Sequence, residues 1–183
     1  FLFKRDGILY RQVNQTYRGH YDLLMGSGLY EQLVKKDALV RHQEMDIAPF
    51  VPESGYKVLQ PEVIPFISYP YEWSFSMLKD AAMLTLEICN LALQKGMVLK
   101  DASAYNIQFL DGKPILIDTL SFERYEEGTP WVAYRQFCQH FLAPLALMAL
   151  TDIRLGQLLR VHIDGIPLDL ANELLPGKVR WNL

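Results

Sequence analysis

Three polar residues, Asp101, Asn106 and Asp118, stand five and twelve residues apart within the segment LKDASAYNIQFLDGKPILIDTLSF, residues 99–122. An Asp-x4-Asn pair, followed by a hairpin that ends in a second Asp, is typical of sites that transfer a phosphoryl group from ATP with Mg²⁺. One Asp orients the attacking hydroxyl, while the Asn and the other Asp supply oxygen ligands to the metal ion. The spacing therefore predicts Asp101 as a catalytic residue and Asn106 and Asp118 as metal ligands.

The residues around this motif predict the strands that hold it. Residues 106–110 alternate between polar and apolar, as expected of a half-buried strand, and residues 114–118 form a more continuously apolar second strand. Asp111-Gly112 between them is a strong signal for a hairpin turn. A purely structural role for these three residues also stays open, because an Asp or Asn can cap a turn or end a strand.

The N-terminal third is predicted to be a small α+β unit. Asp6-Gly7 lies between two apolar runs and indicates a β-hairpin over residues 1–13. A helix is expected to begin near Ser27, which would act as its N-cap. Two further strands are expected at residues 56–60 and 62–68, before a turn at residues 69–72 that contains Pro70.

The rest of the chain is predicted to be mainly helical. A long apolar helix runs from Ser74 toward Gly96, a typical stop signal. Thr129-Pro130 has the pattern of a helix start, and Pro144 is expected to kink that helix or to start a new one. Further helices are expected at residues 152–161 and 168–175. Six apolar side chains are predicted to be largely buried in this part: Leu86, Ile88, Phe109, Ile117, Phe137 and Phe141.

Composition limits the class of protein. The chain has 183 residues, half of them hydrophobic, and a net charge of −3. These values argue against a disordered protein, and scattered Lys and Arg residues argue against a nucleic-acid partner. We expect no membrane association and a cytoplasmic location, because no apolar stretch is long enough to span a bilayer and no signal peptide opens the chain. Cys89 and Cys138 fall in apolar helical patterns and are interpreted as buried free thiols.

The order of these elements resembles the protein-kinase-like fold. More specifically, the chain is similar to the kinase-like region that precedes class I S-adenosylmethionine-dependent methyltransferase domains in bacterial nodulation-protein-like proteins. The resemblance extends along nearly the whole chain, through phrases such as GILYRQVN, GLYEQLV, PEVIPFISYPYEWSF, LKDASAYNIQF, IDTLSFE and PWVAYRQFCQHFLAPLALM. No Gly-rich motif for S-adenosylmethionine appears, so the resemblance implies a methyltransferase domain downstream and no such cofactor site within this chain.

The resemblance assigns roles residue by residue. Asp101 matches the catalytic Asp of kinases, Asn106 the metal-binding Asn, and Asp118 the metal-binding Asp that precedes Phe-Gly. Arg11 lies on the strand where kinases keep a phosphate-binding Lys, and Glu31 lies on the first helix as its expected partner. Arg is not a routine substitute for that Lys, so a surface Arg and a solvated Glu are the alternative.

Three other positions enter the nucleotide site by the same resemblance. Tyr69 and Tyr71 fall on the interlobe hinge, residues 69–73, which would line an adenine pocket. Lys100 borders the site and would contact phosphate. Each of these residues can equally be a packing or solvated loop residue.

Several features of kinases are absent from the sequence. No G-x-G-x-x-G loop is present, and Gly26-Ser27-Gly28 follows the hairpin, in the wrong place for one. Leu99 and Lys100 replace the His and Arg of His-Arg-Asp, and Thr119 replaces the Phe of Asp-Phe-Gly. The lack of an activation loop argues against peptide substrates.

The sequence therefore predicts an α+β, protein-kinase-like, two-lobed fold. The strand-rich N-lobe is expected over residues 1–72, and the helical C-lobe, with the loop and hairpin of residues 99–122, over residues 73–183. One function is ATP- and Mg²⁺-dependent phosphotransfer to a small hydroxylated or glycan-like acceptor. The alternatives are a catalytically degenerate, regulatory module for a methyltransferase and a purely structural domain.

Overall fold

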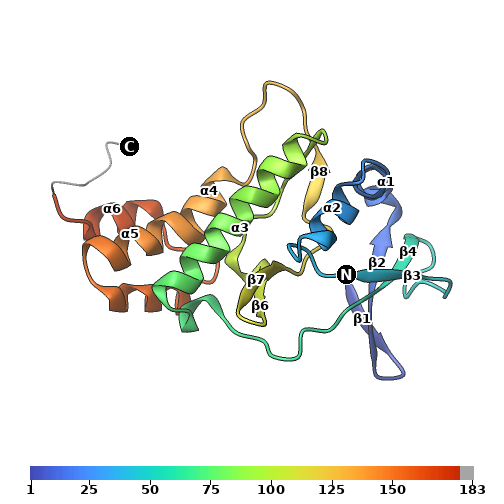
Figure 1. Ribbon diagram of the computed structural model, residues 1–183, viewed down its shortest axis with the longest axis horizontal. Coiled ribbons are helices and arrows are strands. Elements are labelled where there is room, and N and C mark those ends of the chain that lie inside the picture. The colour runs from blue at the N-terminus through green and yellow to red at the C-terminus, as the bar shows by residue number, and fades with distance from the viewer. Residues whose placement is uncertain (178–183) are drawn as a thin grey trace.

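The computed structural model describes residues 1–177 and has a mixed α+β architecture, as the sequence predicts. Four strands form one antiparallel sheet in the order β1-β2-β4-β3. Their bounds are β1 Leu2–Arg5, β2 Ile8–Asn14, β3 His42–Met45 and β4 Gly55–Pro61. In Figure 1 this sheet lies at the N-terminal side of the molecule, and most helices lie at the other side.

The first hairpin forms where the sequence predicts it. Asp6 and Gly7 have φ angles of 51° and 79°, the left-handed values that a two-residue hairpin turn requires. The register pairs Leu2 with Arg11 and Arg5 with Ile8. This hairpin fixes the position of Arg11 on the sheet.

Two short helices, not one, follow the hairpin. They are α1 Arg18–Gly26 and α2 Leu29–Lys35. The predicted start at Ser27 is wrong by one position, because Gly28 (φ 75°) is the N-cap of α2. The Ser27 hydroxyl still accepts a hydrogen bond from the Leu29 N–H, at 3.3 Å. The sequence reading missed α1, because Gly26 and Gly28 obscured where one helix ended and the next began.

The predicted strand at residues 62–68 does not exist. The partner of β4 on its outer side is instead β3, whose Met45 pairs with Val58. Residues 62–69 form an irregular connection along the lower edge of the molecule to the helical part (Figure 1). Pro65 has no N–H to donate to a sheet, whereas β3 is a half-exposed edge strand without the apolar alternation that marks a strand in a sequence.

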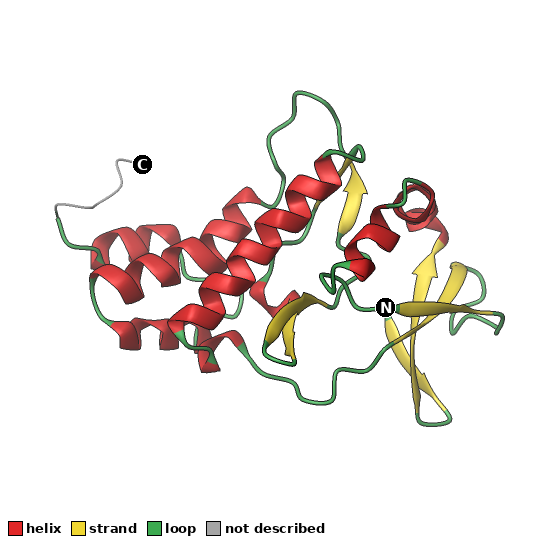
Figure 2. Ribbon diagram, viewed as in Figure 1, coloured by secondary structure: helices red, strands yellow, loops and turns green. Residues whose placement is uncertain are grey.

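The long helix α3, Phe75–Leu93, agrees with the prediction. Ser74 is its N-cap and accepts a hydrogen bond from the Met77 N–H. Gly96, with a φ of 70°, follows its end. Four short strands come next: β5 Met97–Leu99, β6 Ile107–Leu110, β7 Lys113–Leu116 and β8 Phe122–Arg124. Figure 2 shows the β6–β7 hairpin between the helical region and the four-stranded sheet.

In the second helical stretch a new α-helix starts at Ala143, next to Pro144, which is one of the two outcomes expected there. This stretch consists of α4 Tyr134–Phe137, a π-helical turn Cys138–Leu142 and α5 Ala143–Leu150. Pro144 has no N–H to donate to the helix, and the π-turn places the Ala143 N–H on the Cys138 carbonyl instead. A 3₁₀ helix, Ile153–Arg160, and α6, Leu168–Leu174, complete this part and agree with the predicted positions.

The predicted helix start at Thr129-Pro130 is wrong. The Thr129 hydroxyl donates to the Glu126 carbonyl at 2.7 Å, so it closes a turn and does not cap a helix. The first helical residue is Tyr134. A Thr-Pro pair fits a turn as well as a helix N-terminus, so the signal alone did not decide between them.

The main hydrophobic core crosses the boundary predicted at residue 72. Leu29 and Leu33 of α2 belong to the same buried cluster as Leu78 and Ile88 of α3. The sheet adds two small clusters of its own, around Val13 and around Val58. The short helices therefore join the sheet to the helical part through shared packing.

Burial of the six predicted core residues is mixed. Ile88 and Phe141 are fully buried, but Leu86 is 40% exposed on the outer face of α3, so that prediction is wrong. Phe109, Ile117 and Phe137 are partly buried. Cys89 and Cys138 are buried free thiols, as predicted. Within residues 1–177, none of the helices has the length and apolar character needed to cross a membrane.

Candidate phosphate and metal site

The segment that carries the predicted site is a closed loop. Strands β5 and β8 pair at its two ends, with Leu99 opposite Phe122. The Lys100 N–H donates to the Ser121 carbonyl at 2.8 Å and continues this pairing by one residue. Between these ends, β6 and β7 pair around Asp111-Gly112, where the hairpin was predicted, with Ile107 opposite Leu116.

Asp118 lies where this loop meets the N-terminal sheet. Its Oδ1 accepts a hydrogen bond from the Leu120 N–H at 2.8 Å. The same oxygen lies 2.6 Å from Nη1 of Arg11 on β2, and both side chains are about one-fifth exposed. Arg11 and Asp118, 107 positions apart in the chain, thus form an ion pair across the interface.

Asn106 is held beside Asp118 by the hairpin. Its carbonyl accepts a hydrogen bond from the Ile117 N–H at 2.8 Å, so the two strands bring residue 106 next to residue 117. Its side-chain Nδ2 donates to the Ser121 hydroxyl at 3.5 Å. These hydrogen bonds place Asn106 close to Asp118 at the end of the hairpin.

Asp101 lies on the other side of the loop. Its Oδ1 accepts hydrogen bonds from the Ser103 N–H at 3.0 Å and from Nε2 of Gln136 at 2.9 Å. Gln136 on α4 also accepts the Ala102 N–H through Oε1, at 2.7 Å. The sequence reading missed Gln136, because nothing in the sequence marks a contact 35 residues away. Gln136 therefore makes one hydrogen bond to the Asp101 carboxylate and one to the Ala102 backbone, and together they fix Asp101 to the helical part.

The structure does not bring Glu31 to Arg11. Glu31 is exposed in the first turn of α2, and Arg11 pairs with Asp118 instead. The expected Arg11–Glu31 pair is therefore wrong. The register of β2 points Arg11 toward the hairpin, whereas Glu31 lies on the outer side of its helix.

Lys100 contacts an aromatic ring. Its Nζ lies 4.5 Å from the centroid of Tyr17, and the Tyr17 hydroxyl donates to the Phe122 carbonyl. Burial raises the pKa of Tyr17 above its ordinary value, so this hydroxyl stays protonated and keeps its donor role. Lys100 is exposed and lies at the junction between the first helices and the loop.

Tyr69 and Tyr71 stack on each other at the start of the helical part. Their ring centroids are 5.5 Å apart and the rings are nearly parallel. The connection before them is fixed at Ser68, whose backbone N–H and carbonyl both bond to the side-chain amide of Gln108 on β6, at 2.9 and 3.0 Å. The tyrosines therefore form a surface stack beside this attachment.

A cavity of about 410 Å³ lies between the sheet, the hairpin and the connection of residues 62–67. Arg11, Asn106 and Asp118 all line it, so three of the predicted residues meet there. Asp101, Glu31, Lys100, Tyr69 and Tyr71 are not among its lining residues. The remaining walls are mostly apolar: Leu2, Leu9, Val40, Leu59, Pro61, Val63, Ile64, Ile67 and Ile117. The sequence reading missed His42, which also lines this cavity.

Two oxygen-bearing side chains suit Mg²⁺ better than they suit a transition metal. Mg²⁺ is usually held in proteins by one or two side chains, with water and substrate phosphate completing its shell. Within residues 1–177 no three His, Cys, Asp or Glu side chains form a cluster able to hold a metal by themselves. The donor set at Asn106 and Asp118 therefore fits a Mg²⁺ ion that arrives with a phosphate ligand.

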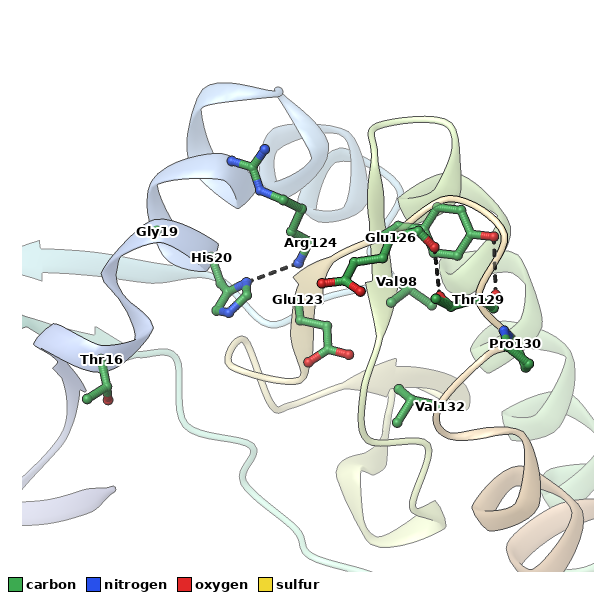
Figure 3. Close-up of a pocket in the computed structure, with 11 residues that line it drawn as sticks. Thr16, Gly19, His20, Val98, Glu123, Arg124, Glu126, Thr129, Pro130 and Val132 are labelled. Atoms are coloured by element: carbon green, nitrogen blue, oxygen red, sulfur yellow. Dashed lines mark hydrogen bonds between the residues drawn. The ribbon is translucent and has the colours of Figure 1, made fainter.

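A second, larger cavity of about 630 Å³ lies between α1 and the chain around β8 (Figure 3). His20 Nδ1 accepts the Arg124 N–H there, at 3.0 Å. Glu123 and Glu126 also line it, and none of the predicted site residues does. This cavity marks where α1 bonds to β8, outside the predicted phosphate site.

Comparison with known proteins shows that the sequence of this chain is similar to that of a bacterial nodulation protein. No protein-family model matches it. It is 42% identical over 111 residues, 61% of its length, to the nodulation protein NoeA of Rhizobium meliloti (strain 1021). The matched region covers 23% of NoeA, so the similarity spans about a quarter of that relative's length. The similarity agrees with the nodulation-protein-like resemblance of the sequence.

Proposed function

We propose that this chain carries a kinase-like site that binds ATP with Mg²⁺ in the cavity between the sheet and the hairpin. The observation that carries the proposal is the meeting of Arg11, Asn106 and Asp118 in one cavity, whose other lining residues are apolar except for His42, Glu62 and Thr119. An apolar cavity with a few polar groups at one end is typical of small-molecule sites. Arg11 would bind phosphate, and Asn106 and Asp118 would hold the metal ion.

The arrangement of the chain supports the same proposal. A sheet with helices between its second and third strands comes first, then a connection, a long helix and a loop with a hairpin. This order is the one that the kinase-like fold leads us to expect. Arg11 on the second strand reaches Asp118 at the hairpin end, although its expected partner was Glu31.

The proposed activity is phosphotransfer to a small hydroxylated or glycan-like acceptor. ATP with Mg²⁺ supplies the phosphoryl group when bound. Asp101 then orients the acceptor hydroxyl. Its Oδ1 already accepts two N–H groups, which leaves Oδ2 to accept the hydroxyl proton.

The experiment is a thermal-shift titration with ATP and Mg²⁺. Binding to the folded state alone stabilises it by about 2.7 kcal/mol at a hundredfold excess over the dissociation constant. For a chain of this length we expect a rise in Tm of roughly 5–10 °C. Asp118→Asn removes a charged ligand and should abolish the Mg²⁺-dependent part of the shift.

Asp111→Asn is the matched control. Asp111 is exposed in the hairpin turn, on the same β6–β7 unit, and does not line the cavity. Asn tolerates its positive φ of 50°, so this variant should keep the full shift. If wild type and Asp118→Asn melt identically with and without ATP and Mg²⁺, the proposed site is wrong.

A second candidate function is a degenerate regulatory module, attached to a methyltransferase in a longer polypeptide. Two observations favour it: Arg11 already neutralises Asp118, and Asp101 does not line the cavity. The greater length of NoeA is compatible with further domains. A Mg²⁺-dependent shift without any transfer of phosphate from ATP, tested with simple sugars as acceptors, would favour this candidate.

A further inference from the structure

Two nitrogen atoms of cavity-lining side chains have no hydrogen-bond partner among residues 1–177. These are Nε of Arg11 and Nδ1 of His42, and both are shielded from water. A buried polar atom without a partner costs about 1–3 kcal/mol, so such atoms are rare and call for an explanation. A third such atom, Nδ1 of His140, does not line this cavity, whereas a molecule bound in the cavity would lie beside both Arg11 and His42.

The role of His42 follows from its neighbours. The Tyr21 hydroxyl donates its proton to Oε1 of Glu44 at 2.9 Å, and the same hydroxyl lies 3.0 Å from Nε2 of His42. Because Tyr21 has only one proton, Nε2 must be the donor in the second contact. The imidazole therefore carries its proton on Nε2, and Nδ1 is an acceptor that lacks a donor.

The charge state of the imidazole agrees with this assignment. Burial lowers the pKa of His42 to about 4, against an opposing influence of Glu44, so the ring is neutral near pH 7. The charged groups around it are Glu44 on its own strand and Arg11 on β2. A neutral ring with a fixed tautomer distinguishes a ligand that offers an N–H from one that does not.

The sheet places His42 and Arg11 at opposite sides of the cavity. Arg11 lies opposite Leu59, and Leu59 lies opposite Glu44, two residues from His42. Alternation along the strands puts both side chains on one face of the sheet, about 10 Å apart across two strand spacings and about 7 Å apart along the strands, or roughly 12 Å in all. The intervening wall is formed by Leu59 and Pro61, so it is apolar. This span suits a flat ring with a donor at one end and an anionic tail at the other.

We propose that His42 is a specificity-determining residue of the cavity, and that its Nδ1 accepts an N–H from the base of a bound nucleotide while Arg11 binds the phosphates. The proposal rests on the proposed nucleotide site and adds the preference for a base with an N–H donor. Nδ1 is shielded in this structure, so the proposal requires the imidazole, which lines the cavity, to turn toward the bound base. The 6-amino group of adenine is such a donor.

The experiment compares two ligands that differ in that donor. ATP and purine riboside 5′-triphosphate, which lacks the 6-amino group, are titrated with Mg²⁺ into wild type by calorimetry. We expect ATP to bind at least tenfold more tightly, a difference of about 1.4 kcal/mol. In His42→Phe the affinity for ATP should fall to that for the analogue, while His162→Phe, far from the cavity, should keep the preference.

A second variant covers the case in which His42→Phe does not fold. Tyr21→Phe leaves the imidazole in place but removes the group that fixes its tautomer, so the preference for ATP should shrink. Equal binding of both ligands by wild type, or an unchanged preference in either variant, would overturn the role of His42 and leave the nucleotide site standing. If wild type binds neither triphosphate, the nucleotide site and this inference both fail.

Discussion

At the residue scale, the chemistry of the cavity depends on side chains from distant parts of the chain. Arg11 comes from the first hairpin and Asp118 from the end of the second, and their ion pair joins the two. Local spacing predicted Asp118, through the Asp-x4-Asn motif and the hairpin, whereas Arg11 was assigned by the resemblance to kinases. Their contact was not predicted, because the same resemblance made Glu31 the expected partner of Arg11.

His42 was missed for a related reason. A single His on a polar strand, His42–Met45, carries no local signal of function. Its importance comes from Tyr21 of α1 and Glu44, which hold its tautomer, and from the cavity on its other side. Only the packing of α1 on the sheet brings these groups together.

The burial of His42 predicts how stability depends on pH. The unfolded chain binds a proton at this ring below about pH 6.5, whereas the folded protein does so only below about 4. The unfolded state therefore binds more protons in this window, and the free energy of unfolding falls as the pH drops from about 6.5 to 4. With allowance for partial exposure, we expect a loss of about 2 kcal/mol from this residue.

Urea unfolding of wild type and His42→Phe at pH 7.5 and pH 4.5 measures this contribution. Wild type should lose more stability than the variant between the two pH values. The pKa of His140 is also lowered by burial, and it contributes with the same sign in both proteins. Parallel losses in wild type and variant would show that His42 titrates alike in the folded and unfolded states.

At the scale of elements, the sequence predicted best where local chemistry decides the structure. Asp6-Gly7 and Asp111-Gly112 form their turns with positive φ angles, and Ser74 caps α3. The wrong predictions concern segments whose structure depends on contacts with other elements. The β3 strand exists because β4 offers it an edge, and residues 62–68 form no strand although they are apolar.

The π-turn near Pro144 has a structural consequence of its own. The helix shift frees the Gln139 carbonyl, which accepts the Ile166 N–H at 2.9 Å. Gly165, with a φ of 91°, packs so closely that an added Cβ would lie 2.6 Å from the Cβ of Gln139. The turn at residues 162–166 therefore depends on a glycine for two reasons, backbone conformation and space.

Gly165→Ala is predicted to destabilise the protein by more than the conformational strain alone. That strain amounts to about 1–2 kcal/mol for an L-residue with positive φ, and the clash with Gln139 adds to it. Gly128→Ala is the matched control, because Gly128 has a φ of 83° and nothing within 4 Å of an added Cβ. Chemical denaturation should show a clearly larger loss for Gly165→Ala, and equal losses would contradict the packing described here.

At the scale of the whole molecule, the cavity exists because three segments meet. Hydrogen bonds from Tyr17 to the Phe122 carbonyl, and from the Arg124 N–H to His20, attach the first helices to β8. The Gln108 amide attaches the connection at Ser68 to the β6–β7 hairpin. None of these contacts could be read from the sequence, because each joins residues at least 40 positions apart.

Gln108→Ala tests whether this attachment maintains the cavity wall. The substitution leaves the Ser68 N–H and carbonyl without their partner, which should cost about 1–3 kcal/mol. Val63, Ile64 and Ile67 precede Ser68 and line the cavity, so their amides should exchange with solvent faster in the variant. ATP binding should weaken too, although Asn106 and Asp118 are unchanged.

Gln157→Ala is the control, since Gln157 makes one exposed hydrogen bond to the Tyr71 carbonyl at the far end of the same connection. It should change stability by less than about 1 kcal/mol and leave exchange at residues 63–67 as in wild type. Unaltered exchange and nucleotide affinity in Gln108→Ala would mean that the connection is held by its apolar contacts. The wall of the cavity would then depend on Val63 and Ile67, whose side chains are both exposed.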